Sequence, residues 1–268
     1  MKGRVLIVAG SDSGGGAGIQ ADIKTVTALN GYAATAITAL TAQNTQGVFG
    51  IHGIPIDFIA QQMTLVLDDI GADSIKTGML HDVPVIETVS QVLAEKAQGI
   101  PLVVDPVMVA KGGAALLVAE ARDALRRKLL PLATIVTPNV PEAEALADIP
   151  IASEADMEEA GRRILALGPR HVLVKGGHLE GRDTVIDVLV GSGGVEHFTG
   201  ARIDTTSTHG TGCTLASAIA TGLAQGMDVA TAVARARDYV VAALRTAPGY
   251  GKGHGPLNHA VTVTPFPS

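Results

Sequence analysis

The sequence predicts an α/β fold in which helices cover both faces of a mostly parallel β-sheet that has an antiparallel edge. Short β-branched runs alternate with longer segments of helical periodicity, which is the pattern of repeated strand and helix units. The runs are nearly all apolar, as strands buried on both faces require. The 268 residues fit within one α/β domain, and no repeat or low-complexity linker interrupts them. We therefore expect a single domain over residues 1–268.

Six apolar runs are predicted to be strands, and they cover residues 4–9, 33–41, 74–77, 102–105, 135–137 and 171–175. The antiparallel edge is predicted from residues 185–198, where two alternating runs flank the sequence Gly191-Ser192-Gly193-Gly194. Alternating runs around such a glycine turn are typical of a β-hairpin.

Helices are predicted where apolar residues recur every three or four positions. This spacing is kept by Ile56, Ile59, Met63, Val66, Leu67 and Ile70, and later by Ile164, Leu165 and Leu167. Two Ala-rich segments, residues 211–225 and 229–245, are predicted to be helices joined across Gly226. The glycine-containing tail from Pro248 is predicted to be a loop that packs back on the surface.

Composition and charge exclude several classes of function. A net charge of −6 without a Lys/Arg cluster disfavours nucleic acid as a partner, because such binding relies on concentrated basic patches. No apolar run approaches the ~20 residues that a membrane span needs, and no export signal is visible. The single cysteine, Cys213, rules out an internal disulfide and fits the cytoplasm. Small-molecule chemistry is the class that remains.

Polar or glycine-rich turns follow five of the predicted strands, at residues 10–18, 78–79, 105–108, 137–139 and 176–177. In open parallel sheets ligands bind beyond the carboxyl ends of the strands, so these turns should surround one cleft. Two turns resemble nucleotide-binding loops only superficially. Residues 10–18 lack the G-x-G-x-x-G spacing, and residues 176–182 have Arg and Asp in place of the P-loop Lys and hydroxyl.

The segment of residues 208–214, Thr-His-Gly-Thr-Gly-Cys-Thr, lies directly before an Ala-rich helix and is predicted to bind an anion. Glycines allow a phosphate to approach the backbone closely, and the first turn of a helix has unpaired N–H groups and partial positive charge. Cys213 has two interpretations. It is either a small buried helix residue, or a thiol whose pKa the helix N-terminus lowers, so that it accepts a proton from a substrate hydroxyl.

Asn139 and Glu142 lie three residues apart, where a predicted strand leads into a helix. Their oxygens suit Mg²⁺ that also holds nucleotide phosphates. The alternative is a capping box, with Asn139 as the N-cap and Glu142 at the third position, and both roles can coexist. Asp105 ends an apolar strand at the same edge, where a carboxylate is costly unless it pairs with a cation or binds metal.

Histidine spacing gives no indication of a zinc site. The eight histidines are scattered along the chain, and no His-x-His or His-Glu-x-x-His motif occurs. His209, beside the glycine turn, is therefore assigned no role.

At Gly210-Thr211-Gly212-Cys213 the sequence resembles the ribokinase-like kinases, whose glycine-rich turn forms an anion hole and ends in the catalytic base. Most of these kinases have Asp at the last position. Cysteine there, with the motifs at residues 10–22, 105–108 and 137–139, resembles the hydroxymethylpyrimidine kinase branch. The resemblance runs from about residue 5 to 259 and also includes residues 175–177 and 251–256. Gly14 departs from the family pattern, which often has Ser there.

The resemblance implies a three-layer α-β-α ribokinase-like fold and a homodimeric kinase that uses ATP and Mg²⁺. Its substrate would be hydroxymethylpyrimidine, phosphorylated on the hydroxymethyl group and then on the resulting monophosphate during thiamine biosynthesis. Gln43 would recognise the pyrimidine, since a carboxamide offers one donor and one acceptor. The remaining roles follow by resemblance. Apolar walls come from Ala17, Met79 and Val107, ATP contacts from Asn139, Glu142 and Lys175, metal contacts from Asp105 and Glu142, and catalysis from Gly210, Thr211, Gly212 and Cys213.

Three other functions remain open. Cysteine-containing relatives of this branch phosphorylate pyridoxal, although the sequence Thr41-Ala42-Gln43-Asn44-Thr45 favours a pyrimidine. A non-catalytic pyrimidine or nucleotide sensor could keep the same fold. Covalent catalysis by Cys213 is the third possibility, but no adjacent His-Asp relay is evident in the sequence.

Overall fold

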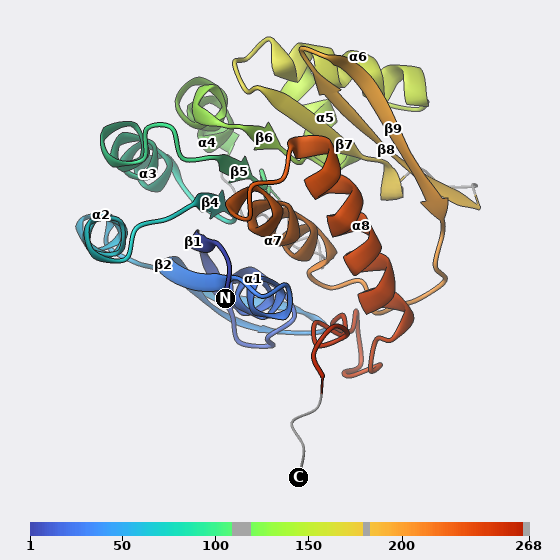
Figure 1. Ribbon diagram of the computed structural model, residues 1–268, viewed down its shortest axis with the longest axis horizontal. Helices are drawn as coiled ribbons and strands as arrows, with labels where there is room; N and C mark the ends of the chain where they lie inside the picture. Colours follow the sequence, from blue (N-terminus) through green and yellow to red (C-terminus); the bar gives the residue numbers. More distant parts are fainter. Residues whose placement is uncertain (109–118, 179–182, 265–268) are drawn as a thin grey trace.

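The computed structural model describes residues 1–108, 119–178 and 183–264. Within these residues a nine-stranded sheet forms the middle layer, in the order β3-β2-β1-β4-β5-β6-β7-β8-β9 (Figure 1). Strands β2, β1, β4, β5, β6 and β7 run parallel, while β3, β8 and β9 pair antiparallel at the two edges. The strands are β1 (Arg4–Asp12), β2 (Tyr32–Asn44), β3 (Gly47–Gly53), β4 (Ser74–Thr77), β5 (Leu102–Val104), β6 (Ile135–Val136), β7 (His171–Lys175), β8 (Thr184–Gly191) and β9 (Gly194–Ala201).

Helices form the two outer layers. Neighbouring residues of each strand point to opposite faces of the sheet, so the apolar strands present a hydrophobic surface on both faces, and helices cover each of them. Leu6 and Val8 of β1 pack in one core with α2 (Ile56–Asp69), α3 (Val83–Lys96), α5 (Val140–Ala147) and α6 (Glu154–Leu165). Val5 and Ile7 pack in the other core with α1 (Gly18–Ala28), α7 (Thr211–Ala224) and α8 (Val229–Arg245). The predicted three-layer fold is confirmed. Shorter helical segments are α4 (Ala119–Ala124), a π-helical turn (Leu125–Leu129) and two 3₁₀ turns (Leu130–Leu132 and Gly176–His178).

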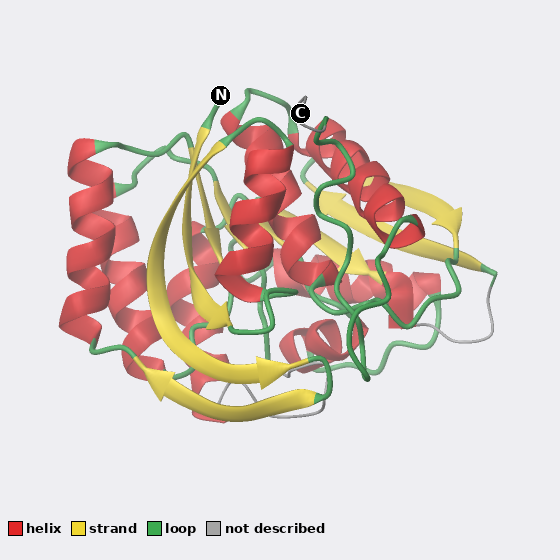
Figure 2. Ribbon diagram, turned by 90° about the horizontal axis from the view of Figure 1, so that it is seen from below, coloured by secondary structure: helices red, strands yellow, loops and turns green. Residues whose placement is uncertain are grey.

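The predicted hairpin edge is confirmed as β8 and β9, but the opposite edge was missed. Strand β3 has the sequence Gly-Val-Phe-Gly-Ile-His-Gly, and glycine weakens strand propensity. Its hydrogen bonds to β2 supply the stability that its sequence lacks, and they extend β2 to Asn44. Figure 2 shows β2 as the long curved strand that bends away from the other strands together with β3. Helices α1 and α3 were likewise not located from apolar spacing.

The helices differ in whether a side chain caps their first turn. Asp82, Asn139, Ser153 and Asp228 cap α3, α5, α6 and α8 with their side chains, which satisfies orphan N–H groups of the first turn. Helices α1 and α7 have no side-chain cap. Both begin at glycine-rich turns that follow the edge where ligands are expected.

The C-terminal tail packs back on the body of the protein, as predicted. His209 forms a β-bridge with Pro256, and the Tyr239 hydroxyl donates to the carbonyl oxygen of His259 at 2.6 Å. In the described ranges, no helix combines the length and apolar character needed to cross a membrane.

Candidate active site

A cleft of about 830 Å³ lies where the turns after the parallel strands meet the N-terminus of α7. This agrees with the prediction that those turns surround one cleft. The lining includes all the predicted site residues: Ala17, Gln43, Met79, Asp105, Val107, Asn139, Glu142, Lys175, Gly210, Thr211, Gly212 and Cys213. The structure thus brings these residues together, while the roles assigned to them stay predictions.

The turn before α7 can only be built with glycine at position 210. Gly210 has φ of 84°, in the left-handed region that side chains disfavour, and a Cβ there would collide with the carbonyl oxygen of Gly16. The two glycine turns of the site are therefore in direct contact. Because α7 has no side-chain cap and Thr211, Gly212 and Cys213 line the cleft, its first-turn N–H groups are placed to meet an anion.

A cation and two carboxylates face this turn. Lys175 Nζ lies 3.1 Å from Asp105 Oδ1, and a Cβ on Gly212 would lie 3.2 Å from the same Nζ. Asp105 and Glu142 raise the pKa of Lys175, and their effect exceeds the lowering caused by burial. The ammonium group is thus held in its charged form directly beside the uncapped helix end.

Asn139 and Glu142 form the capping box that the sequence offered as an alternative to metal binding. The Glu142 N–H donates to Asn139 Oδ1 at 2.9 Å, and the Asn139 N–H donates to Glu142 Oε2 at 2.8 Å. Burial raises the pKa of Glu142 to about 7, with a further contribution from Asp105. A carboxylate held this far from water gains from a nearby cation, so the cap does not exclude a role toward metal.

Of the two interpretations of Cys213, the one that requires a thiol with a lowered pKa is wrong. Burial raises the pKa of this thiol to about 12, and the charges of Asp22 and Asp105 act in the same direction. The ammonium of Lys76 and the backbone N–H of Gly18 oppose the shift but do not cancel it. Cys213 therefore carries its proton at neutral pH in the unliganded protein.

Below Cys213 lies a buried ion pair that sequence reasoning missed. Lys76 Nζ is 2.9 Å from Asp22 Oδ2, and both side chains are fully buried. The hydroxyl of Ser217 donates to Asp22 Oδ1 at 2.7 Å. The sequence contained one indication of this pair, because Lys76 is a charged residue inside the apolar strand at residues 74–77. A charged side chain that is buried has to be paired. Only the fold reveals that its partner comes from α1.

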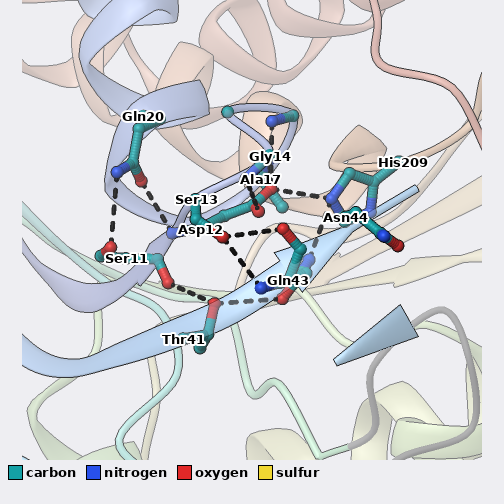
Figure 3. A network of polar contacts seen from close by, with 12 residues as sticks. Ser11, Asp12, Ser13, Gly14, Ala17, Gln20, Thr41, Gln43, Asn44 and His209 are labelled. Carbon is teal, nitrogen blue, oxygen red and sulfur yellow. Dashed lines mark hydrogen bonds and ion pairs between the residues drawn. The ribbon is translucent and has the colours of Figure 1, made fainter. Parts of the chain in front are cut away.

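A second missed group is His209, to which no role was assigned. His209 Nε2 lies 2.8 Å from Asp12 Oδ2 and 3.0 Å from the Gln43 carboxamide nitrogen (Figure 3). Asp12 also accepts backbone N–H groups of Gly14, Gly16 and Ala17. Burial acts to raise the pKa of Asp12, but the hydrogen bonds from His209 and Ala17 outweigh it and lower the pKa.

Apolar residues form the walls next to Gln43. Ala39 and Met79 are buried in a small cluster of their own, with Ile51 and Val107 packed against them. Ile51 belongs to β3, so the strand that the sequence did not predict packs against the cluster that contains Met79. A mostly apolar slot with one orienting amide suits a small aromatic ligand.

The opposite end of the cleft was not predicted. It is lined by Val240, Val241 and Leu244 of α8 and by the ends of β8 and β9. Asp187 of β8 accepts the Gly176 N–H at 2.9 Å and pairs with Arg237 of α8 at 2.8 Å. These bonds hold the turn after β7 against α8. In the sequence, the apolar residues of α8 could not be distinguished from core.

Comparison with known proteins places the chain among kinases. A family model described as phosphomethylpyrimidine kinase matches residues 12–258. The chain is 54% identical over 262 residues to the thiamine biosynthesis bifunctional protein ThiED of Geobacter sulfurreducens, covering 98% of this chain and 53% of that protein. It thus spans about half the length of that relative.

Two further relatives match over almost their whole length. The hydroxymethylpyrimidine/phosphomethylpyrimidine kinase of Streptomyces coelicolor is 48% identical over 256 residues, which cover 95% of this chain and 93% of that protein. The solved structure of Bacillus subtilis pyridoxal kinase in complex with ADP superposes with a TM-score of 0.89 at 36% identity, covering 97% of this chain and 98% of that chain.

Proposed function

The chain belongs to the phosphomethylpyrimidine kinase family, and we propose that it transfers a phosphoryl group from ATP to 4-amino-5-hydroxymethyl-2-methylpyrimidine. It then phosphorylates the monophosphate to the diphosphate, as an enzyme of thiamine biosynthesis. One domain over residues 1–268 carries the activity. The names of the relatives at 54% and 48% identity support this assignment.

One observation carries the proposal: the uncapped end of α7 opens into the same cleft as the Gln43 slot and Lys175. A phosphoryl donor bound along Lys175 and α8 would place its terminal phosphate at Gly210, Thr211 and Gly212. A pyrimidine held at Gln43 would face the same turn from the other side. The cleft therefore accommodates donor and acceptor together.

In the proposed reaction, the hydroxymethyl oxygen attacks the γ-phosphorus, and the bond from that phosphorus to the bridging oxygen breaks to release ADP. The first-turn N–H groups of α7 and the Lys175 ammonium stabilise the charge on the transferred phosphoryl oxygens. Cys213 lines the cleft beside this turn and accepts the hydroxyl proton in its thiolate form, which the positive charge of bound magnesium would favour although burial disfavours it in the unliganded protein. In the second phosphorylation the acceptor is a phosphate oxygen that is already ionised, so no base is needed.

Magnesium would be held by Asp105 and Glu142 together with the phosphates of ATP. Both carboxylates are buried, and Asp105 adds to the raised pKa of Glu142, so a nearby cation would stabilise the ionised form of Glu142. One or two carboxylates plus phosphate oxygens are the ligands that Mg²⁺ usually takes. The ion, when bound, neutralises phosphate charge. Calorimetry should show that Asp105→Asn weakens binding of MgATP more than binding of metal-free ATP.

The proposed function is tested by ADP release from magnesium-ATP with purified protein and the hydroxymethylpyrimidine. Lys175→Met, purified in the same way, controls for contaminating kinases. Absence of pyrimidine-dependent ADP release from folded protein would refute the proposal. Binding of both ligands by calorimetry without ADP release would instead indicate a non-catalytic sensor.

Pyridoxal phosphorylation is the second candidate, because the similar Bacillus subtilis structure is a pyridoxal kinase. We expect the pyrimidine to be preferred, since the 48% identity to the pyrimidine kinase exceeds the 36% identity to that pyridoxal kinase. The kcat/KM values of the two alcohols decide the question. A preference for pyridoxal above about tenfold would overturn the choice of substrate.

Gln43→Leu tests the assignment of the pyrimidine slot. We expect the variant to bind the pyrimidine about 1–3 kcal/mol more weakly, because a polar edge of the ligand loses its hydrogen-bond partner. The weaker binding should appear as a higher KM for the pyrimidine. The KM for ATP should stay unchanged. A wild-type KM for the pyrimidine would show that Gln43 does not contact it.

We also propose that the protein acts in the cytoplasm as a homodimer. The free cysteine Cys213 is consistent with a reducing compartment. Leu40 of β2, Phe49 of β3 and Phe58 of α2 are exposed apolar side chains that a second copy could cover. Light scattering of the purified protein measures its oligomeric state directly.

A further inference from the structure

We propose that His209, anchored by Asp12, sets the direction of the Gln43 carboxamide and so determines which hydrogen-bonding edge the site accepts. The inference rests on the proposed function, in which Gln43 recognises the pyrimidine. His209 is then a positioning residue that decides specificity without contacting the reacting atoms.

Asp12 requires a proton donor at His209 Nε2. Its carboxylate is 2% exposed, and Oδ2 lies 2.8 Å from that nitrogen. A ring nitrogen without a proton would turn its lone pair toward an ionised oxygen, which is unfavourable when both groups are buried. Nε2 therefore carries hydrogen, and this holds for the neutral Nε2–H tautomer and for the protonated ring alike.

The same ring nitrogen faces the carboxamide of Gln43. In the structure the amide nitrogen lies 3.0 Å from His209 Nε2. Both nitrogens carry hydrogen, so two donors face each other and neither has an acceptor in this contact. The amide oxygen lies 3.4 Å from Thr41 Oγ1, but the Thr41 hydroxyl already donates to the Ser11 carbonyl at 2.8 Å. Both neighbours of the carboxamide are therefore mismatched in this orientation (Figure 3).

A half-turn of the carboxamide removes both conflicts. Amide oxygen and nitrogen have similar size, and their positions are assigned from the surrounding hydrogen bonds. After the turn, the amide oxygen shares the Nε2–H of His209 with Asp12 in a three-centre hydrogen bond, and the amide nitrogen donates to a lone pair of Thr41 Oγ1. Two neighbours on different segments, residue 209 before α7 and residue 41 in β2, thus select the same orientation.

This orientation fixes what Gln43 presents to the cleft. The free lone pair of the amide oxygen faces the cleft on the side of His209, and the free N–H of the amide nitrogen faces the cleft on the side of Thr41. An aminopyrimidine matches this order, because its amino group donates and the neighbouring ring nitrogen accepts. The corresponding 4-oxo compound has the reverse order, with a ring N–H beside a carbonyl oxygen. His209 therefore makes the site selective for the amino form.

The test compares 4-amino-5-hydroxymethyl-2-methylpyrimidine with its 4-oxo analogue in the wild type, His209→Leu and His209→Gln. The wild type should prefer the amino compound by more than about tenfold in kcat/KM. His209→Leu frees the carboxamide to rotate, so this preference should fall by about tenfold, while KM for ATP changes less than about twofold. His209→Gln keeps a donor near the Nε2 position and should retain most of the preference. His197→Leu, at a histidine on β9 outside the cleft lining, is the matched control.

Thr41→Val provides an independent variant in case His209→Leu does not fold. It preserves the side-chain shape and removes the acceptor for the amide nitrogen. The ratio of kcat/KM for the amino compound to that for the 4-oxo analogue should therefore also fall. An undiminished preference in Thr41→Val and any folded His209→Leu would overturn the orientation proposal. An equal loss on both substrates would also overturn it, because a purely structural role predicts that result. Failure of the wild type to phosphorylate either alcohol would instead refute the proposed function.

Discussion

Cys213 illustrates how two effects compete at a single residue. A helix N-terminus stabilises a negative charge by about 0.3–1 kcal/mol, and one pKa unit corresponds to about 1.4 kcal/mol. Burial shifts the pKa of a fully buried group by up to about 3–5 units, and for the partly buried Cys213 a fraction of that shift already outweighs the helix N-terminus. A protonated thiol is also a poor nucleophile, which disfavours the covalent mechanism.

Alanine at position 213 should therefore slow the first phosphorylation by only about tenfold, less than a fully effective general base would contribute. The second phosphorylation should be affected less, because its acceptor is already ionised. Lys175→Met should slow both steps by about 10²–10³, as expected for the loss of a group that stabilises the transition state. Single-turnover rates with the alcohol and with its monophosphate measure the difference. A larger effect of Cys213→Ala than of Lys175→Met on the alcohol would show that proton removal dominates.

At the scale of elements, the C-terminal tail fixes the tip of the β2 and β3 hairpin. The His254 N–H donates to the Thr45 carbonyl oxygen at 2.9 Å, and a Cβ on Gly253 would collide with that same oxygen. On its other side the tail accepts the His209 N–H through the Gly255 carbonyl at 3.0 Å. The tail thus links the hairpin that carries Gln43 to the turn before α7.

Gly253→Ala should consequently raise KM for the pyrimidine by about tenfold, since the tip has to move and a misplaced hydrogen bond costs about 1–3 kcal/mol. The KM for ATP should change little. Gly47→Ala is the matched control, because Gly47 lies on the same hairpin and a Cβ there meets nothing within 4 Å. Equal effects of the two variants would contradict the role of the tail.

The tail is also held to the helical layer by His259. Its Nε2 lies 3.0 Å from the Thr214 hydroxyl of α7, and burial lowers the pKa of His259 to about 4. Because the ring is neutral when folded, the unfolded chain binds the extra proton below its ordinary pKa of about 6.5. Stability contributed by the neutral ring is present above that pH and is lost as pH falls toward 4.

His259→Gln keeps a hydrogen-bonding group near the Nε2 position but cannot titrate, so its stability should depend less on pH. Between about pH 6.5 and 4 the wild type should lose up to about 3 kcal/mol more than the variant. Thermal unfolding of both proteins across this range measures the difference. Parallel pH profiles would show that His259 does not account for acid sensitivity.

At the scale of the whole molecule, the buried pair of Lys76 and Asp22 joins the sheet to the helical layer that carries the phosphate-binding turn. Lys76 lies in β4, Asp22 in α1, and Ser217 in α7, which all meet at one carboxylate. The charges of Lys76 and Asp22 also act on Cys213. The pair therefore connects the stability of the layers to the electrostatics of the site.

Asp22→Asn should destabilise the protein by about 3–5 kcal/mol, because it leaves the Lys76 ammonium buried without a countercharge. Combining it with Lys76→Met should restore part of this loss, since no uncompensated charge remains. Thermal unfolding of the wild type, both single variants and the double variant gives the coupling between the residues. Additive effects would show that the two charges do not depend on each other.

Local sequence was sufficient to predict the central strands, the β8 and β9 hairpin, α2, α7 and α8, because apolar spacing and turn glycines act over a few residues. The turns at the carboxyl ends of the strands were predictable for the same reason. Residues such as Asn139 and Glu142 could be assigned a capping box because both partners lie within four residues of each other. The family resemblance then predicted which residues of these turns belong to the site.

Tertiary structure decided what depends on distant partners. The glycine-rich β3 is a strand only because β2 offers it hydrogen bonds, and β3 in turn packs Ile51 against the cluster that contains Met79. Pairing of His209 with Asp12 spans 197 positions of the chain, and that of Lys76 with Asp22 spans 54. The protonation of Cys213 depends on the burial and charges that these contacts create. Local propensity and spacing are encoded along the chain, whereas burial and long-range electrostatics exist only once the layers have packed.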